Sequence, residues 1–107
     1  LCPIGAEPMT ATDPLASTLH TFRAVAFGLP PRVWRELPAH TQHQWRLIAV
    51  RVTERIDDIG RVSGRDCFRA WAAHMEATWE TQPETYQERW NRMAALVNQM
   101  MTRRQAA

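Results

Sequence analysis

The amino-acid sequence predicts an all-α fold in which two tandem helical hairpins form a four-helix bundle or an intertwined helical dimer. Apolar residues recur every three or four positions through most of the chain, which is typical of amphipathic helices. No segment sustains the period-two alternation typical of strands. A tryptophan pattern also occurs twice, 45 residues apart, and relates Trp34 to Trp79 and Trp45 to Trp90. Such a repeat predicts one helical unit used twice.

The repeat extends beyond the tryptophans. Four further identities hold the same offset: Pro38 and Pro83, Gln42 and Gln87, Ala49 and Ala94, and Val52 and Val97. We therefore expect a single helical domain over residues 13–107, with repeat one at about 14–59 and repeat two at about 63–102. Residues 1–12 are expected to be a disordered tail or an upstream extension.

The first helix is expected to begin at Asp13-Pro14, because Asp is a good N-cap and Pro suits the first helical position. Gly28 and the prolines after it are expected to end this helix. Its inward face is expected to hold Leu15, Leu19, Phe22 and Ala26.

The second helix is expected to follow a short turn, residues 33–37, that carries Trp34. It opens at Pro38 and ends at Gly60, which suits a left-handed C-cap. Its inward face is expected to hold Thr41, Trp45, Ile48, Val52, Ile56 and Ile59.

The third helix is expected to start at Ser63, because Ser63-x-x-Asp66 has the form of a capping box. It should run as far as Pro83 and carry Phe68, Trp71, Met75 and Trp79 inward. The fourth helix starts at Pro83, frays from Met101, and should bury Tyr86, Trp90, Met93, Val97 and Met100. The connection between the second and third helices is short, which favours antiparallel neighbours or one bent helix.

The composition of the chain indicates where in the cell the protein is located. No run approaches the roughly 18 apolar residues of a membrane span, and no signal peptide is visible. The two cysteines, Cys2 and Cys67, do not suggest a structural disulfide, which favours a reducing compartment. We expect no membrane association and a location in the cytoplasm of a bacterial or phage-infected cell. Cys67 is interpreted as a small core residue.

No catalytic motif is recognisable, so we expect no enzyme, no cofactor and no metal site. The chain has four glycines, none clustered into a phosphate loop. His40 and His43 share a helix face and could supply two metal ligands, but a third ligand at compatible spacing is missing. We interpret them as solvated side chains, and the glutamates from Glu76 to Glu88 as a solvated acidic edge.

Arginine is the other notable feature. All 13 basic residues are arginine, which a GC-rich genome explains most simply. Five of them should converge if the second and third helices are antiparallel: Arg51, Arg55, Arg61, Arg65 and Arg69. Interleaved acids favour internal salt bridges, and the alternative is contact with nucleic acid. Because Trp and Arg dominate binding hot spots, we name as candidate partner-binding residues these five together with Arg32, Trp34 and Arg35.

Charge is distributed unevenly between the two repeats. Residues 32–69 carry a net charge of +3, whereas residues 76–92 carry −2. Opposite surfaces of this kind complement each other between protomers. We therefore expect a homodimer.

Two families share part of this pattern. Trp34-x-x-Leu37-x7-Trp45-x3-Ala49 resembles the junction of the last two helices in HMG-box domains, a likeness that we interpret as convergent helix packing. The chain also resembles small arginine-rich helical accessory proteins of bacteriophages and prophages, over residues 15–56 and 68–101. That resemblance implies a non-enzymatic interaction protein that binds and modulates or inhibits a host macromolecular complex. The alternative is a nucleic-acid-binding module that uses the arginine cluster.

Overall fold

The all-α prediction is confirmed. The computed structural model describes residues 12–73 and 75–106, and these contain four α-helices, two short 3-10 helices and no strand. The elements in order are α1 (Thr12–Phe27), η2 (Trp34–Glu36), α2 (Ala39–Ile59), α3 (Gly64–Trp71), η3 (Trp79–Thr81) and α4 (Glu84–Ala106). The expected tail lies, except for Thr12, outside the described residues. Within the described part, no helix combines the length and apolar character needed to cross a bilayer.

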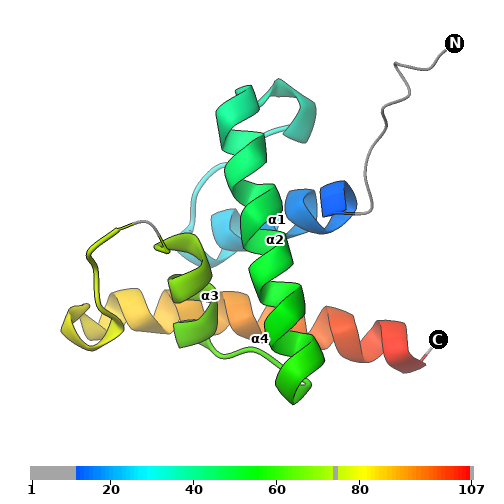
Figure 1. Cartoon of the computed structure of the whole chain (residues 1–107). Helices are drawn as coiled ribbons and strands as arrows, with labels where there is room; N and C mark the ends of the chain where they lie inside the picture. The colour runs from blue at the N-terminus through cyan, green and yellow to red at the C-terminus, as the bar shows by residue number, and fades with distance from the viewer. Residues whose placement is uncertain (1–11, 74, 107) are drawn as a thin grey trace, which may run out of the picture.

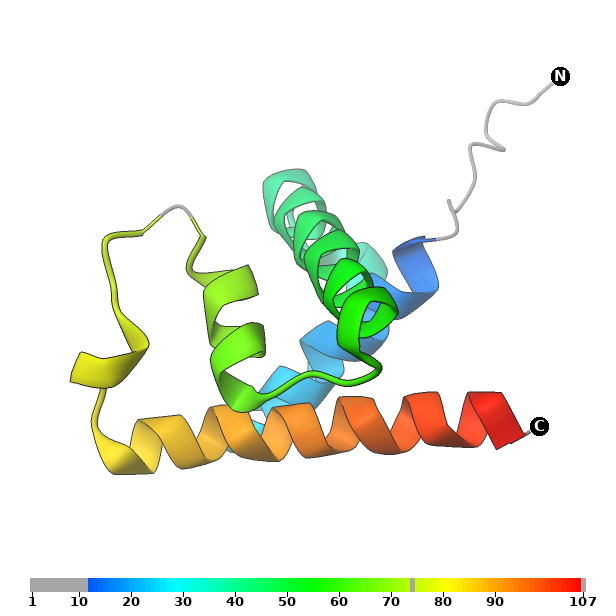
Figure 2. The ribbon, with the colours of Figure 1, turned by 60° about the horizontal axis from the view of Figure 1, so that its bottom comes forward.

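Each of the four helices packs against two of the others. α1 and α3 each pack against both long helices, α2 and α4. In Figure 2, α4 runs along the base of the molecule with the other helices above it, and in the view of Figure 1 α2 crosses α4. α3 runs back beside α2, as the short connection predicts. This arrangement is consistent with a four-helix bundle.

The core draws on all four helices. Its largest fully buried side chains are Leu19, Val52, Cys67, Phe68, Trp90, Met93 and Val97. Burying one large apolar side chain stabilises a fold by about 1.5–3 kcal/mol, so this set supplies much of the driving force. Trp45 and Trp90 are both buried as predicted.

The two copies of the tryptophan pattern adopt the same local structure. Each begins with a 3-10 turn and continues through a proline into a long helix. The side chain of Pro38, the N-cap of α2, makes no capping hydrogen bond. The side-chain amide nitrogen of Gln42 donates back to the Trp34 carbonyl at 2.8 Å. Gln87 donates to the Trp79 carbonyl at the same distance. The internal duplication itself stays a hypothesis, because α1 has 16 residues and α3 only 8.

Two boundaries predicted for the second repeat are wrong. α3 ends at Trp71, so Met75 is 39% exposed and Trp79 lies on the separate 3-10 turn. The backbone is extended at Thr78, with ψ 143°, and again at Gln82, which precedes a proline, with ψ 146°. One helix therefore cannot run on to Pro83. α4, in contrast, continues to Ala106 instead of fraying from Met101.

One inward prediction for α2 is also wrong. Ile59 is 50% exposed, although it continues the apolar stripe of that helix. Gly60, with φ 87°, caps the helix directly after it. The last turn therefore extends beyond the neighbouring helices, and periodicity alone does not reveal where those neighbours stop.

The connection between α2 and α3 is tied to α4 by one side chain. The Val62 amide donates to the Asn98 side-chain oxygen at 2.9 Å, and the Asn98 side-chain nitrogen donates to the Val62 carbonyl at 2.8 Å. Val62 itself is buried. Asn98 therefore satisfies both backbone groups of a residue that has left regular structure.

Replacing Asn98 with alanine is expected to lower the free energy of unfolding by about 1–3 kcal/mol, because Val62 would keep two partly buried polar groups without partners. Urea unfolding followed by circular dichroism measures the change. Gln99→Ala, one position further along α4 and exposed, is the matched control and should change stability far less. Equal losses in the two variants would contradict the assigned role of Asn98.

Cys67 is a core residue, as predicted. Its side chain is fully buried, and burial, with a smaller contribution from Asp66, raises the pKa of the thiol to about 12. Because the thiolate is the reactive form, the native protein should resist thiol reagents.

In a Cys2→Ser background, Ellman's reagent at mildly alkaline pH should leave Cys67 unmodified in the folded protein. The same reagent should modify it completely in denaturant. Rapid stoichiometric labelling of the native protein would show that Cys67 is accessible and would contradict this expectation.

Candidate interaction surface around the α1–α2 connector

The segment between α1 and η2 presents apolar and basic side chains together. Leu29 and Val33 are 47% and 49% exposed, and Arg32 and Arg35 are exposed beside them. Trp34 is half-buried at the start of η2. We call these five residues the connector surface; the connector runs from α1 up to η2 in Figure 1.

Local chemistry explains why these apolar side chains stay outside the core. Gly28, with φ 69°, ends α1 in the left-handed conformation. The Leu29 amide then donates to the Ala24 carbonyl at 2.8 Å. Pro30 and Pro31 cannot continue a helix. The backbone therefore crosses the surface in irregular form, and Leu29 and Val33 remain at the surface.

Trp34 is held in place by contacts with α1 and α2. The Arg46 guanidinium carbon lies 5.9 Å from the Trp34 ring centroid. Arg46 in turn donates to Asp13 through Nε at 2.6 Å and through Nη2 at 3.2 Å. A surface pocket of about 390 Å³ adjoins Trp34. It is lined by Asp13, Pro14, Ser17, Val33, Trp34 and Arg35.

A second pocket, of about 430 Å³, is lined by residues of α1 and of the connector. Three of its lining residues are basic: His20 and Arg23 from α1, and Arg32 from the connector. Burial lowers the pKa of His20, and the charges of Arg23 and Arg32 lower it further. Neither His20 nor Arg23 was selected from the sequence. Their i, i+3 spacing on α1 was the available signal, but the approach of Arg32 depends on the connector.

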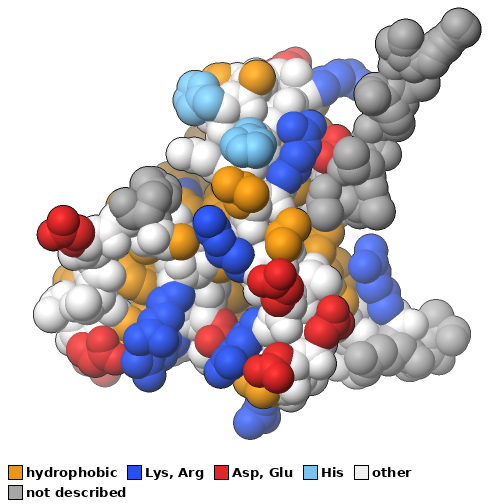
Figure 3. All heavy atoms as spheres, viewed as in Figure 1, with side chains coloured by type: hydrophobic (Ala, Val, Ile, Leu, Met, Phe, Trp, Pro, Cys, Tyr) orange, Lys and Arg blue, Asp and Glu red, His pale blue; other side chains and the backbone are white. Residues whose placement is uncertain are grey.

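Some arginines of the predicted cluster form contacts within the chain. The Arg51 Nη1 donates to the Ala70 carbonyl at 2.9 Å. Arg55 pairs with Asp66 at 3.2 Å and, more distantly at 3.6 Å, with Asp58. The contacts with Ala70 and Asp66 join α2 to α3. Figure 3 shows basic and acidic side chains interleaved on this face.

The remaining three arginines are less constrained. Arg65 pairs with Glu80 at 3.0 Å. Arg61 and Arg69 are exposed and form no ion pair with a described residue. Arg55 and Arg65 thus form ion pairs within the chain, which supports the internal salt-bridge interpretation for those two, whereas Arg51 donates to a backbone carbonyl.

The Asp66 carboxylate belongs to both the arginine contacts and the helix cap. It accepts from the Ser63 amide at 3.0 Å, and the Ser63 hydroxyl accepts from the Asp66 amide at 3.1 Å. Burial raises the pKa of Asp66, but the Ser63 hydrogen bonds and the Arg55 charge outweigh burial and lower it. The predicted capping box is therefore confirmed.

His40 and His43 are both exposed at the start of α2. Within residues 12–73 and 75–106, no group of three or more His, Cys, Asp or Glu side chains is placed to hold a metal ion. The structure therefore does not supply the third ligand that the sequence also lacks.

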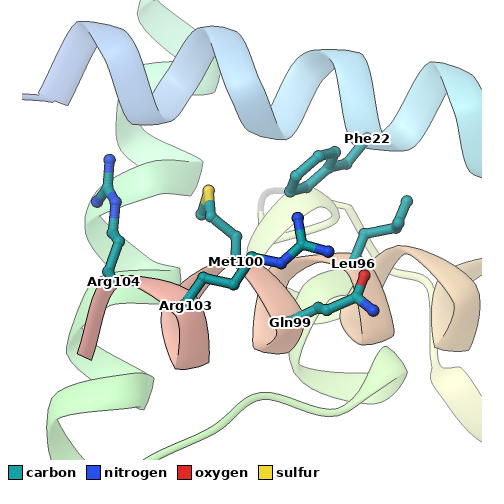
Figure 4. A pocket seen from close by; sticks show the side chains of 6 residues that line it. All are labelled: Phe22, Leu96, Gln99, Met100, Arg103 and Arg104. Carbon is teal, nitrogen blue, oxygen red and sulfur yellow. The ribbon is translucent and has the colours of Figure 1, made fainter. Parts of the chain in front are cut away.

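A further groove lies between α1 and α4. Figure 4 shows Phe22 of α1 facing Leu96 and Met100 of α4, with Arg103 and Arg104 nearby. The pocket measures about 430 Å³. Phe22 and Met100 were expected on the inward faces of their helices, but helical spacing alone does not show that a pocket forms between those faces.

Comparison of the chain with protein-family models, curated proteins and solved structures found no match. The functional argument therefore rests on the geometry of the surface.

Proposed function

We propose that this protein is a non-enzymatic helical interaction protein that binds a protein partner through the connector surface. The observation that carries the proposal is the exposure of Leu29 and Val33 on the same short segment as Arg32 and Arg35. Exposed apolar side chains beside arginine and tryptophan have the composition of binding hot spots.

The chemistry of the surface indicates the chemistry of the partner. Arg32 and Arg35 make no ion pair with a described residue, so their charges remain available. Electrostatic complementarity favours a segment with carboxylates flanking apolar side chains. Trp34 is already fixed by Arg46, which lowers the entropy lost on binding. We therefore propose an acidic protein segment with apolar anchors.

A paired affinity experiment tests this proposal. Tagged wild-type protein and the double variant Leu29→Ser/Val33→Ser are used to capture partners from the native host, and captured proteins are quantified by mass spectrometry. We expect a specific partner whose recovery falls at least about tenfold in the variant, which corresponds to about 1.4 kcal/mol.

The matched control is Leu47→Ser/Val50→Ser, which removes two apolar side chains that are each 40% exposed on α2. It should retain the partner, and circular dichroism should show equal helical content in all three proteins. Equal loss in the two double variants would show that the connector surface has no special role.

We also propose that the protein forms a homodimer, because the basic residues 32–69 and the acidic residues 76–92 complement each other. Glu76, Glu84 and Glu88 are exposed in support of this. Size-exclusion chromatography with light scattering at low and high salt tests it. A monomer at micromolar concentration in both buffers would contradict the dimer without affecting the connector proposal.

The role in a phage or mobile element, with inhibition of a host complex, stays a prediction that rests on the resemblance alone. The nucleic-acid alternative is favoured by one observation, the exposure of Arg61 and Arg69 without intramolecular ion pairs. A mobility-shift assay tests it, because phosphate binding weakens steeply with salt. The absence of any shift at low salt would exclude this alternative.

A further inference from the structure

Arg23 is held in an unusual aromatic environment. Its guanidinium carbon lies 4.8 Å from the ring centroids of both Phe27 and Trp71, and 5.7 Å from that of Trp90. These rings come from α1, α3 and α4. Arg23 thus links three helices through the attraction between its charge and the ring faces.

The hydrogen-bonding groups of Arg23 are not satisfied by the described part of the protein. Its Nε is buried and has no hydrogen-bond partner, and no carboxylate among the described residues pairs with it. Its terminal nitrogens form no hydrogen bond with described residues either, but they are not among the buried atoms without partners. They therefore reach the surface, where Arg23 lines the pocket beside the connector.

Three aromatic rings lie around the central carbon of the guanidinium, whereas its N–H donors lie in its plane and point outward from that carbon. A planar fork of this kind matches the oxygens of a carboxylate or phosphate. The aromatic cage therefore orients Arg23 and leaves its terminal donors free for an oxyanion.

Two more basic side chains line the same pocket. Arg32 is exposed on the connector, and His20 is fixed by an edge-on contact with Trp45 at a centroid distance of 5.3 Å. Both arginines lie close enough to His20 to lower its pKa, after the larger effect of burial. The described residues place no carboxylate in ion-pair contact with any of the three. Because the pKa of His20 is lowered below its ordinary value, the positive charge that attracts an anion to this pocket near neutral pH comes from Arg23 and Arg32.

We propose that the pocket lined by His20, Arg23 and Arg32 is a binding site for an oxyanion, a phosphate or a carboxylate group. Arg23 supplies the oriented fork, Arg32 supplies a second charge from the connector, and His20 supplies a ring nitrogen. At about 430 Å³, the pocket admits a substituted oxyanion as well as the free ion. The inference goes beyond the proposed function, because a free anion can bind whether or not a protein partner uses the connector surface.

The test is a titration of the full chain with inorganic phosphate, at constant ionic strength maintained with chloride and near neutral pH. Nuclear magnetic resonance follows the Arg23 Nε–H and the His20 ring protons. We expect saturable shifts of both signals with a dissociation constant in the millimolar range or tighter. Shifts that stay linear in phosphate, or no shift at all, would overturn the proposal.

Two arginine variants on the connector distinguish a specific phosphate site from non-specific electrostatic attraction. Arg32→Gln removes a lining charge and should weaken phosphate binding about tenfold or more, as expected for a hydrogen bond to a charged group. Arg35→Gln removes the same charge but lines the opposite pocket, and should change the affinity less than about twofold. Equal weakening by both variants would show that no specific site exists.

A third variant tests the fork itself. Arg23→Lys keeps the charge but loses the planar donors, and should weaken binding at least as much as Arg32→Gln. Its helical content is checked by circular dichroism; if this variant does not fold, the two connector variants decide the matter. Phosphate affinity unchanged in a folded Arg23→Lys protein would overturn the role of Arg23.

A parallel titration with acetate shows whether the site also accepts a carboxylate. Saturation by phosphate alone supports a phosphate-bearing ligand. Saturation by both supports a site that also accepts the carboxylate of a protein side chain. Failure of both titrations overturns this inference but leaves the affinity experiment on the connector surface unaffected, so the two proposals fail independently.

Discussion

Replacing Gly64 with alanine is expected to lower the free energy of unfolding by about 3 kcal/mol or more, as overpacking against rigid neighbours does at its upper range. A Cβ at this position would lie 2.6 Å from the Asn91 backbone nitrogen and 2.8 Å from its Cα. A flexible side chain can move away from such a contact, but the backbone in the middle of α4 cannot move without shifting the helix. Gly64 is therefore what allows α3 to approach α4 closely.

Urea unfolding of Gly64→Ala beside Gly60→Ala measures this effect. At Gly60 an added Cβ meets nothing within 4 Å, and only the left-handed φ of 87° opposes the change. That strain costs about 1–2 kcal/mol. A smaller loss at Gly64 than at Gly60 would show that α3 and α4 can separate at little cost, and would contradict the close approach.

Replacing Trp90 with alanine is expected to be the most damaging truncation in the core, with a loss of about 3–5 kcal/mol. The Trp90 ring is fully buried and lies within 5.1–6.3 Å of four aromatic rings. They belong to Phe27, Phe68, Trp71 and Tyr86. Arg23 also lies over it at 5.7 Å, so the change would disturb contacts among α1, α3 and α4.

Trp45→Ala is the matched control, because the sequence repeat makes Trp45 the counterpart of Trp90. The aromatic ring close to Trp45 is that of His20, at 5.3 Å. Since each aromatic pair adds about 0.5–1.5 kcal/mol beyond burial, Trp45→Ala should cost less by at least about 1 kcal/mol. A cost equal to or above that of Trp90→Ala would contradict this ordering; if both variants are unfolded, the corresponding Trp→Phe pair tests the same ordering.

Much of the secondary structure follows from short stretches of sequence. The boundary of α2 at Gly60, the capping box at Ser63 and the turn around Trp34 all depend on residues within four positions of one another. The short length of α3 does not. Phe68, Trp71, Met75 and Trp79 keep helical spacing, but the chain must leave the helix early to form η3 and enter α4. Periodicity records which positions are apolar, not where the helix stops.

The candidate sites also differ in how much of each could be predicted from neighbouring residues. Arg32, Trp34 and Arg35 could be placed together on the connector because they are neighbours in the chain and follow a proline-rich break. The pairing of Arg55 with Asp66 and of Arg65 with Glu80 needed the packing of separate elements. The aromatic cage of Arg23 could not be predicted from the sequence, because its rings are 4, 48 and 67 positions away.

The sequence by itself determined an all-α chain, the starts of its helices and the turn around Trp34 that leads into α2. These features are local, because caps, prolines and left-handed glycines act on the backbone within one helical turn. Only the tertiary structure decided how Gly64 brings α3 against α4, which arginines are neutralised, and where Arg23 meets His20 and Arg32. Those contacts depend on distances between segments far apart in the chain, which local spacing does not encode.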